Sequence, residues 1–152
     1  MGSFRYSSQV LHSFVKEKKG IVGKKLSSKD IKNAEGKIVG KEVRVTLESE
    51  TGRVAIIEWI LKAAQLSDVT TYHSVLLVDY QRIRGVDYSA IERTKFFKTH
   101  IPKGWHENVV DPNTQENRHE PLDLGNVSDF EDFSVKIAKL WNIDYQSEGR
   151  LL

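Results

Sequence analysis

Residues 41–61 of this 152-residue chain read KEVRVTLESETGRVAIIEWIL, and this stretch decides the expected fold. Val43, Val45 and Leu47 alternate with polar residues, which is the two-residue period of a strand with one buried face. The polar SETG segment, residues 49–52, predicts a tight turn. The RVAIIEWIL segment that follows is rich in β-branched and aromatic residues, so the whole stretch predicts a β-hairpin.

Two further strands are expected after a polar connection. The sequence YHSVLLVDYQRIRGVDYS, residues 72–89, contains two apolar runs separated by a bend at residues 79–81. Gly85, inside the second run, is expected to mark a β-bulge. Together with the hairpin, these runs predict a four-stranded antiparallel meander.

The segment NVSDFEDFSVKIAKLWNIDY, residues 126–145, predicts an amphipathic helix. Ser128, followed three residues later by Glu131, matches a capping box. Five large apolar residues then share one helical face: Phe130, Phe133, Ile137, Leu140 and Trp141. Because this face and the apolar face of the meander can bury each other, the expected fold is α+β, a four-stranded antiparallel sheet with the C-terminal helix packed on one face.

Residues 1–40 precede this body, residues 41–152, and are expected to form one domain with it. The sequence SSQVLHSFVKEKKG, residues 7–20, combines helical apolar spacing with a serine cap and predicts an N-terminal helix of about three turns. The sequence GIVGKKLSSKDIKNAEGKIVG, residues 20–40, has four glycines and predicts a loop, with at most a short helical turn after Ser28.

The charge of the chain is unevenly distributed. Residues 1–41 carry ten Lys and Arg against three Asp and Glu, about +7, and residues 42–152 carry thirteen against eighteen, about −5; the two sum to the formal net charge of +2. Such a basic segment can bind phosphate backbones, or it can be a solvated segment whose lysines only keep it soluble. The candidate nucleic-acid contacts here are Lys16, Lys18, Lys19, Lys24 and Lys25.

Composition and motifs exclude several classes of site. The chain has no cysteine, hence no thiolate nucleophile, disulfide or cysteine-ligated zinc or iron–sulfur cluster. It has no phosphate-cradling glycine loop, Gly-x-Ser-x-Gly elbow or acidic metal cluster. The N-terminus does not read as a signal peptide, and no apolar run approaches ~18 residues. We therefore expect a soluble, cytoplasmic protein without membrane association.

The stretch THIPKGWHENVVDPNTQENRHEP, residues 99–121, holds three of the five histidines of the chain. It shows no strong periodicity, so a long ordered loop is expected between the fourth strand and the final helix. Pro102 and Gly104 restrict its course. Trp105 is expected either to anchor the loop against the body or to stack on a nucleic-acid base.

Side chains of this stretch and of the fourth strand can supply acid–base chemistry at neutral pH. Metal-independent RNA cleavage needs a base, an acid and cations for the phosphorane charge, and His, Glu and Arg can fill these roles. The candidate catalytic residues are His106, Glu107, His119, Arg84 and Asp87. Arg82 is expected to share a strand face with Arg84, where the pair binds either phosphate or neighbouring aspartates.

A metal site is the other hypothesis for the histidines. His100, His106 and His119 could ligate one divalent ion, but their spacing matches no compact motif, so neither a metal nor another cofactor is predicted. His73, at the start of an apolar strand, is interpreted as a half-buried strand residue.

The order of these parts resembles a known family. A strand such as HSVLLV, a tight reversal, a strand of the type RIRGVDYS, a histidine-bearing polar segment and a final LGNVSDFEDFSVKIAKL helix are similar, over about residues 72–142, to TumE-like toxin components of toxin–antitoxin pairs. In that family the strand ends in an Asp-Asn pair and the histidines are closely spaced, whereas here Tyr88 follows Asp87 and the histidines are spread out. The resemblance implies a small toxin that acts on RNA or another nucleic acid, with a helix-turn-helix antitoxin as its partner.

The leading hypothesis is therefore a toxin-like protein with ribonuclease-like chemistry. A non-catalytic domain that binds a partner protein is the second hypothesis, and a nucleic-acid binder that uses the basic segment is the third. The oligomeric state stays open at the level of sequence.

Overall fold

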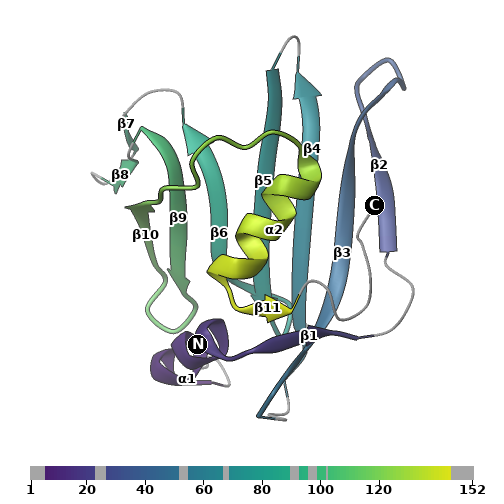
Figure 1. The fold of residues 1–152 in the computed structure, drawn as a ribbon. Coiled ribbons are helices and arrows are strands. Elements are labelled where there is room, and N and C mark those ends of the chain that lie inside the picture. Colours follow the sequence, from purple (N-terminus) through teal and green to yellow (C-terminus); the bar gives the residue numbers. More distant parts are fainter. Residues whose placement is uncertain are drawn as a thin grey trace.

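A computed structural model of the chain describes residues 6–22, 27–51, 55–66, 69–89, 93–95, 99–101 and 103–144. Within these residues the architecture is mostly β, with two helices (Figure 1). The helices are α1 (Ser8–Lys16) and α2 (Phe130–Leu140). The strands are β1 (Lys19–Ile21), β2 (Ser27–Lys32), β3 (Ile38–Ser49), β4 (Ile57–Leu66), β5 (Val69–Val78), β6 (Gln81–Ser89), β7 (Arg93–Lys95), β8 (Thr99–Ile101), β9 (Gly104–Asp111), β10 (Glu116–Pro121) and β11 (Ile143–Asp144). Neither helix is long and apolar enough to cross a membrane.

Nine of the described strands form one sheet, in the order β10-β9-β6-β5-β4-β3-β1-β11, with β2 also paired to β3. Neighbours are antiparallel except for β1 and β11, which are parallel. The predicted four-stranded sheet is therefore wrong. The four strands expected between residues 41 and 89 occur as β3 to β6, but two segments interpreted as loops extend the sheet on both sides.

The glycine-rich segment, residues 20–40, is the first of these corrections. It contributes most of β1, all of β2 and the start of β3. Between β2 and β3, the side-chain Oδ1 of Asn33 accepts hydrogen bonds from the backbone N–H groups of Glu35 and Lys37, both at 3.0 Å. Gly36 has a φ of 82°, which glycine adopts without strain. β2 is mostly exposed, so it lacks the apolar alternation from which a strand is recognised.

The histidine-rich segment, residues 99–121, is the second correction. It forms β8, β9 and β10 instead of a long loop, and β9 and β10 make a hairpin in register from Asp111↔Glu116 to His106↔Pro121. The turn closes where the backbone N–H of Gln115 donates to the carbonyl of Asp111, at 2.7 Å. Both faces of β9 carry polar residues, so the sequence shows no two-residue period there.

Both predicted helices are confirmed, with a shifted cap at α2. The hydroxyl of Ser7 caps α1 by accepting from the N–H of Val10. At α2 the cap is Asp129, one residue after the predicted Ser128; its Oδ1 accepts from the N–H of Asp132, at 2.7 Å. The Asp132 carboxylate accepts in turn from the N–H of Ser128, at 2.9 Å, so two aspartates perform the capping expected of a Ser/Glu pair.

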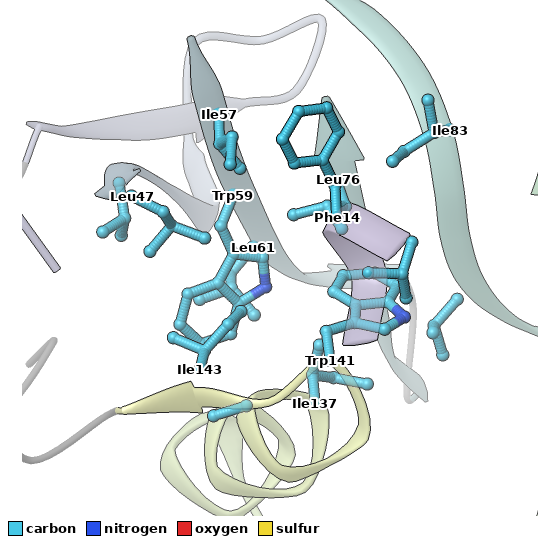
Figure 2. Packing of buried hydrophobic residues seen from close by; sticks show 14 of the residues in the cluster. Phe14, Leu47, Ile57, Trp59, Leu61, Leu76, Ile83, Ile137, Trp141 and Ile143 are labelled. Atoms are coloured by element: carbon cyan, nitrogen blue, oxygen red, sulfur yellow. The ribbon is translucent and has the colours of Figure 1, made fainter. Parts of the chain in front are cut away.

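The core lies between the sheet and α2, which crosses one face of the sheet (Figure 1, Figure 2). Trp59 and Leu76 of the sheet meet Ile137 and Trp141 of the helix end, and Phe14 of α1 joins them. Of the predicted helix face, Phe133, Ile137 and Trp141 are buried, and Phe130 and Leu140 pack against the core. We call the covered side of the sheet the α2 face and the opposite side the outer face.

Lys19 joins the ends of the two helices. It is completely buried, and its ammonium donates to the carbonyl oxygens of Val15, Glu17 and Trp141, at 2.8, 2.6 and 2.5 Å. Burial lowers the pKa of Lys19 to about 8, although the charge of Glu17 opposes this shift. Lys19 was a candidate nucleic-acid contact, but in this position it has no surface to offer to a phosphate.

Candidate functional site

The sheet opens between β5 and β6 at one end. The two strands pair only as far as Ser74↔Val86. Beyond that pair, β5 continues alongside β4 and β6 continues alongside β9. The side chains of His73 and Asp87 bridge the opening, with Nδ1 of His73 hydrogen-bonded to Oδ1 of Asp87. A pair of side chains thus replaces the backbone pairing where the strands separate.

A β-bulge in β6 brings these two residues together. The strands are joined by the turn Asp79–Tyr80, in which both residues have positive φ, 48° and 67°, as in a two-residue type I′ hairpin. Within β6 the register shifts by one residue at Ile83. Without this extra residue, His73 would lie opposite Val86. With it, His73 lies opposite Asp87.

The same bulge separates the two arginines that were expected to share a strand face. Arg82 pairs with Leu77 and is exposed, whereas Arg84 pairs with Leu76 and is only 7% exposed. Because consecutive residues of β5 point to opposite faces, the two arginines do as well. The bulge at Ile83 lies two residues before Gly85, the position at which the sequence predicts it.

A chain of four polar side chains crosses the outer face, one from each of β5, β6, β9 and β10. We call it the polar row: His73, Asp87, Asn108 and His119. Asn108 Nδ2 donates to Asp87 Oδ2 at 2.8 Å, and Asn108 Oδ1 bonds to His119 Nδ1. An ionised carboxylate and an amide oxygen only accept hydrogen bonds, so Nδ1 of His73 donates to Asp87 and Nδ1 of His119 donates to Asn108; in the neutral His73 ring, Nε2 is then the acceptor.

The polar row keeps Asp87 ionised. Burial by itself would raise the pKa of Asp87, but the hydrogen bond and charge of His73, the hydrogen bond from Asn108 and the charge of His106 outweigh burial. The pKa of Asp87 is therefore lowered from its ordinary 3.8. A carboxylate that stays charged can orient an imidazole and stabilise its protonated form.

His106 supports the polar row from below the surface. It pairs with Asp87 across β6 and β9, and its ring packs edge-on against His119, with ring centroids 5.4 Å apart. Its Nδ1 lies 3.4 Å from the carbonyl oxygen of Gly104. His106 is 3% exposed, so a substrate does not reach this predicted catalytic residue in the present conformation.

A pocket of about 540 Å³ lies at the opening between β5 and β6. Its walls come from the separated strand ends and from the connection that leads into α2. The lining residues are Thr70, Thr71, Tyr72, His73, Asp87, Tyr88, Trp105, Gly125, Asn126 and Val127. The His73–Asp87 pair is thus accessible from a concave surface, the usual setting of a binding site.

Aromatic rings close the opening on the α2 face. The ring of Phe133 stacks between those of Tyr72 and Trp105, with centroids 5.3 and 5.6 Å away. Tyr88 lies edge-on against Trp105 at 5.3 Å and is 57% exposed. Trp105 therefore anchors its strand to α2, as one of its two predicted roles required, while Tyr88 presents an aromatic surface to the pocket.

The other predicted catalytic residues lie on the α2 face. Glu107 Oε2 accepts a hydrogen bond from Trp141 Nε1, at 2.8 Å, and lies 3.8 Å from Arg84 Nε. Asp87 is on the outer face, one residue away from the core-facing Val86. The five predicted catalytic residues therefore fall into two groups: Asp87, His106 and His119 come together on the outer face, and Arg84 and Glu107 come together under α2.

The predicted nucleic-acid contacts do not gather into one patch among the described residues. Lys16 and Lys18 are exposed at the end of α1, and Arg82 is exposed on β6. Lys24 and Lys25 lie outside the described residues. His100 lies in β8 and pairs with Thr94 through the backbone. No group of three or more His, Asp or Glu residues in the described part of the chain is arranged to hold a metal ion.

Comparisons with protein-family models, with curated proteins and with solved structures gave no match to this chain. The likeness to TumE-like toxins stays a prediction.

Proposed function

We propose that the protein cleaves single-stranded RNA by metal-independent acid–base catalysis, with His73 as the general base. The observation that carries this proposal is the hydrogen bond between His73 Nδ1 and Asp87 at the wall of the pocket. A carboxylate on Nδ1 orients the ring and directs the basic Nε2 away from Asp87. The pair is half-exposed, with 31% and 37% of the two side chains accessible, so a substrate can reach it.

The reaction that fits a single oriented imidazole is transfer of the phosphate to the neighbouring 2′-oxygen. Nε2 of His73 removes the proton of the 2′-hydroxyl, and the 2′-oxygen forms a bond to phosphorus. The bond between phosphorus and the 5′-oxygen breaks, and this oxygen takes a proton from water. The products are a 2′,3′-cyclic phosphate and a 5′-hydroxyl. Asp87 stabilises the imidazolium that forms at His73.

The surroundings of His73 support an RNA substrate. The exposed ring of Tyr88, backed by Trp105, offers a surface on which an unpaired base can stack. Lys62 of β4 pairs with His73 of β5, so the two side chains are neighbours on the outer face, and the Lys62 ammonium is 3.3 Å from Glu42 Oε1. In this proposal the ammonium turns from Glu42 toward the phosphate and offsets the charge that develops there.

The resemblance to TumE-like toxins adds a biological setting to this proposal. In that setting the protein is a toxin whose expression slows growth, and a small helix-turn-helix antitoxin binds and restrains it. Co-expression with a helix-turn-helix protein encoded by a neighbouring gene would test this part. Restored growth together with co-purification is the expected result, and growth unaffected by the toxin alone would contradict it.

Cleavage of a fluorescent single-stranded RNA in the presence of a metal chelator tests the chemistry. His73→Ala should lower the rate by about 10²–10⁴-fold, since it removes the base. Asp87→Asn keeps the size of the side chain and should lower the rate by at least about tenfold, because the imidazolium loses its counter-charge. The control is Glu35→Ala, in the exposed turn between β2 and β3, which should cleave as fast as the wild type.

A substrate with a single 2′-deoxy sugar at the cleaved position gives an independent check. It should resist cleavage, because the nucleophile is absent. A wild-type protein that cleaves no RNA, with or without divalent metal, would overturn the catalytic proposal. RNA that is then retained on immobilised protein, and lost in Tyr88→Ala, would favour the non-catalytic binding domain.

A further inference from the structure

A cavity of about 450 Å³ lies on the α2 face, between α1, the strands β6, β9 and β10, and the residues that follow α2. Basic side chains from three separate elements line it. Its charged and titratable lining residues are His12, Lys16, Arg84, Arg118, Glu107 and Glu120. A smaller cavity of about 150 Å³ shares His12, Arg84 and Arg118. Neither cavity includes a residue of the His73 pocket.

Arg84 is the buried centre of this cavity. Its Nη1 donates to the carbonyl of Ile83 at 2.8 Å, and its Nη2 donates to Nδ1 of His12 at 3.0 Å. The carboxylate of Glu107 is 3.8 Å from Nε, beyond a good hydrogen bond, and accepts instead from Trp141. A guanidinium has five N–H donors, more than these contacts among the described residues use.

The charge of Arg84 is incompletely compensated. Burial lowers the pKa of Arg84; the charges of Glu107, Glu120 and Asp111 oppose this shift, but the charge of Arg118 adds to it. Two guanidinium groups therefore line one cavity and repel each other, and within the described part of the chain only that of Arg118 is paired at hydrogen-bond distance with a carboxylate, at 3.1 Å from Glu120 Oε1. An anion between them would relieve both the repulsion and the burial of Arg84.

We propose that this cavity binds a tetrahedral oxyanion, either free phosphate or the phosphate group of a small nucleotide. Arg84 and Arg118 would hold its oxygens from two strands, and Lys16 would contact it from α1. A planar carboxylate is satisfied by one guanidinium, which donates two parallel hydrogen bonds. Two guanidinium groups and an ammonium that approach from three different elements suit the oxygens of a tetrahedral group better. This site is independent of the proposed RNA cleavage, and each can fail without the other.

His12 holds the guanidinium of Arg84 at the wall of the cavity. Because a guanidinium only donates, Nδ1 of His12 accepts the hydrogen bond from Arg84 Nη2, at 3.0 Å. In the larger cavity, Lys16, Arg84 and Arg118 against Glu107 and Glu120 leave a formal charge of +1. The smaller cavity adds the carboxylates of Asp111 and Glu116, so the anion is expected in the larger one.

Calorimetric titration with sulfate tests the site at ionic strength held constant with chloride. We expect saturable binding at one site, weakened about tenfold by either Arg118→Gln or Lys16→Gln, each of which changes an exposed side chain and should leave the fold intact. Lys41→Gln removes an exposed positive charge on β3 and should bind as the wild type does. Sulfate also stabilises proteins without a site, so unsaturable binding, or equal weakening by Lys41→Gln, would overturn the proposal.

Competing ligands complete the test. Displacement of sulfate by AMP but not by adenosine would assign the phosphate of a nucleotide. Displacement by inorganic phosphate alone would assign the free anion, and displacement by neither would overturn the proposal.

Discussion

Strands β6 and β9 carry polar or charged side chains on both faces, but these side chains have different surroundings on the two faces. Under α2, Arg84, Glu107 and Trp141 form a buried cluster in which the helix end supplies a donor. On the outer face, Asp87 and the buried Asn108 belong to the polar row, and a pocket reaches its partly exposed His73–Asp87 end. Along β6, Arg84 and Asp87 are three positions apart, and along β9, Glu107 and Asn108 are consecutive residues.

The difference lies in what covers each face. A buried charge left without its partner is expensive, so the cluster under α2 should govern stability. The His73–Asp87 end of the polar row is partly solvated, and water can replace the hydrogen bond between these two side chains at small cost, so this pair should contribute little to stability and more to chemistry. Substitutions on the two faces can separate these expectations.

The largest effect is expected at Phe133, which fills the opening of the sheet from the α2 face. Phe133→Ala removes a buried ring that stacks on Tyr72 and Trp105, and it should lower the free energy of unfolding by about 3–5 kcal/mol. Urea denaturation measures the change. Val135→Ala, on the exposed side of the same helix, should change it by less than about 0.5 kcal/mol. Equal effects at both positions would mean that α2 does not cover the sheet.

Breaking the charged cluster should have the next largest effect. Glu107→Gln removes the negative charge beside buried Arg84 but keeps an acceptor for Trp141, so we expect a loss of about 2–3 kcal/mol. The same urea experiment applies. A loss below about 1 kcal/mol would show that water already solvates Arg84.

On the outer face, Asp87→Asn should cost only about 1 kcal/mol at pH 7, since the carboxylate is more than a third exposed. The pKa of Asp87 is lowered in the folded protein, so its contribution is present above the ordinary value of 3.8 and is lost as the pH falls through the folded value. The stability difference between wild type and Asp87→Asn should therefore shrink below about pH 4. A difference that grows on acidification would contradict the ionised Asp87.

The smallest effect on stability is expected at Tyr88. Tyr88→Ala removes an exposed ring and should change the free energy of unfolding by less than about 0.5 kcal/mol. If RNA stacks there, RNA affinity should fall by about 1–3 kcal/mol. Tyr80→Ala, at the exposed turn between β5 and β6, is the matched control and should leave RNA affinity unchanged. Equal losses at Tyr80 and Tyr88 would mean that RNA does not stack at the pocket.

The sequence pattern predicts those helices and strands that have one apolar face and one polar face. Val43, Val45 and Leu47 alternate because their strand is covered on one side only, and α2 shows its apolar stripe for the same reason. The hairpin of β9 and β10 was not predicted because β9 is polar on both faces: Glu107 lies on the α2 face and Asn108 on the outer face. No two-residue period is then visible in the sequence. The short strands β1 and β2 are too brief or too exposed to show a period.

The candidate site was predicted only in part, because its geometry depends on register. Asp87, His106 and His119 were recognised by residue type, but His73 and Asn108 were not. For His73, the sequence offers only its distance from the turn Asp79–Tyr80. Counted from that turn, a regular hairpin would place His73 opposite Val86 and not opposite Asp87. Only the bulge at Ile83, which the sequence does not reveal, moves Asp87 into that position.

The parallel pairing of β1 with β11 has a consequence for the order of events during synthesis on the ribosome. β1 ends at residue 21, yet its second neighbour arrives only with residues 143–144. Until then the Lys19 ammonium lacks the carbonyl of Trp141, and one edge of β1 stays open. Contacts between residues so distant in sequence form slowly. The central hairpins can therefore form while the nascent chain is still growing, whereas β1 gains its second neighbour only after the chain is nearly complete. A chain stopped before residue 141 should therefore leave one edge of β1 open and be cut early by proteases near Lys18.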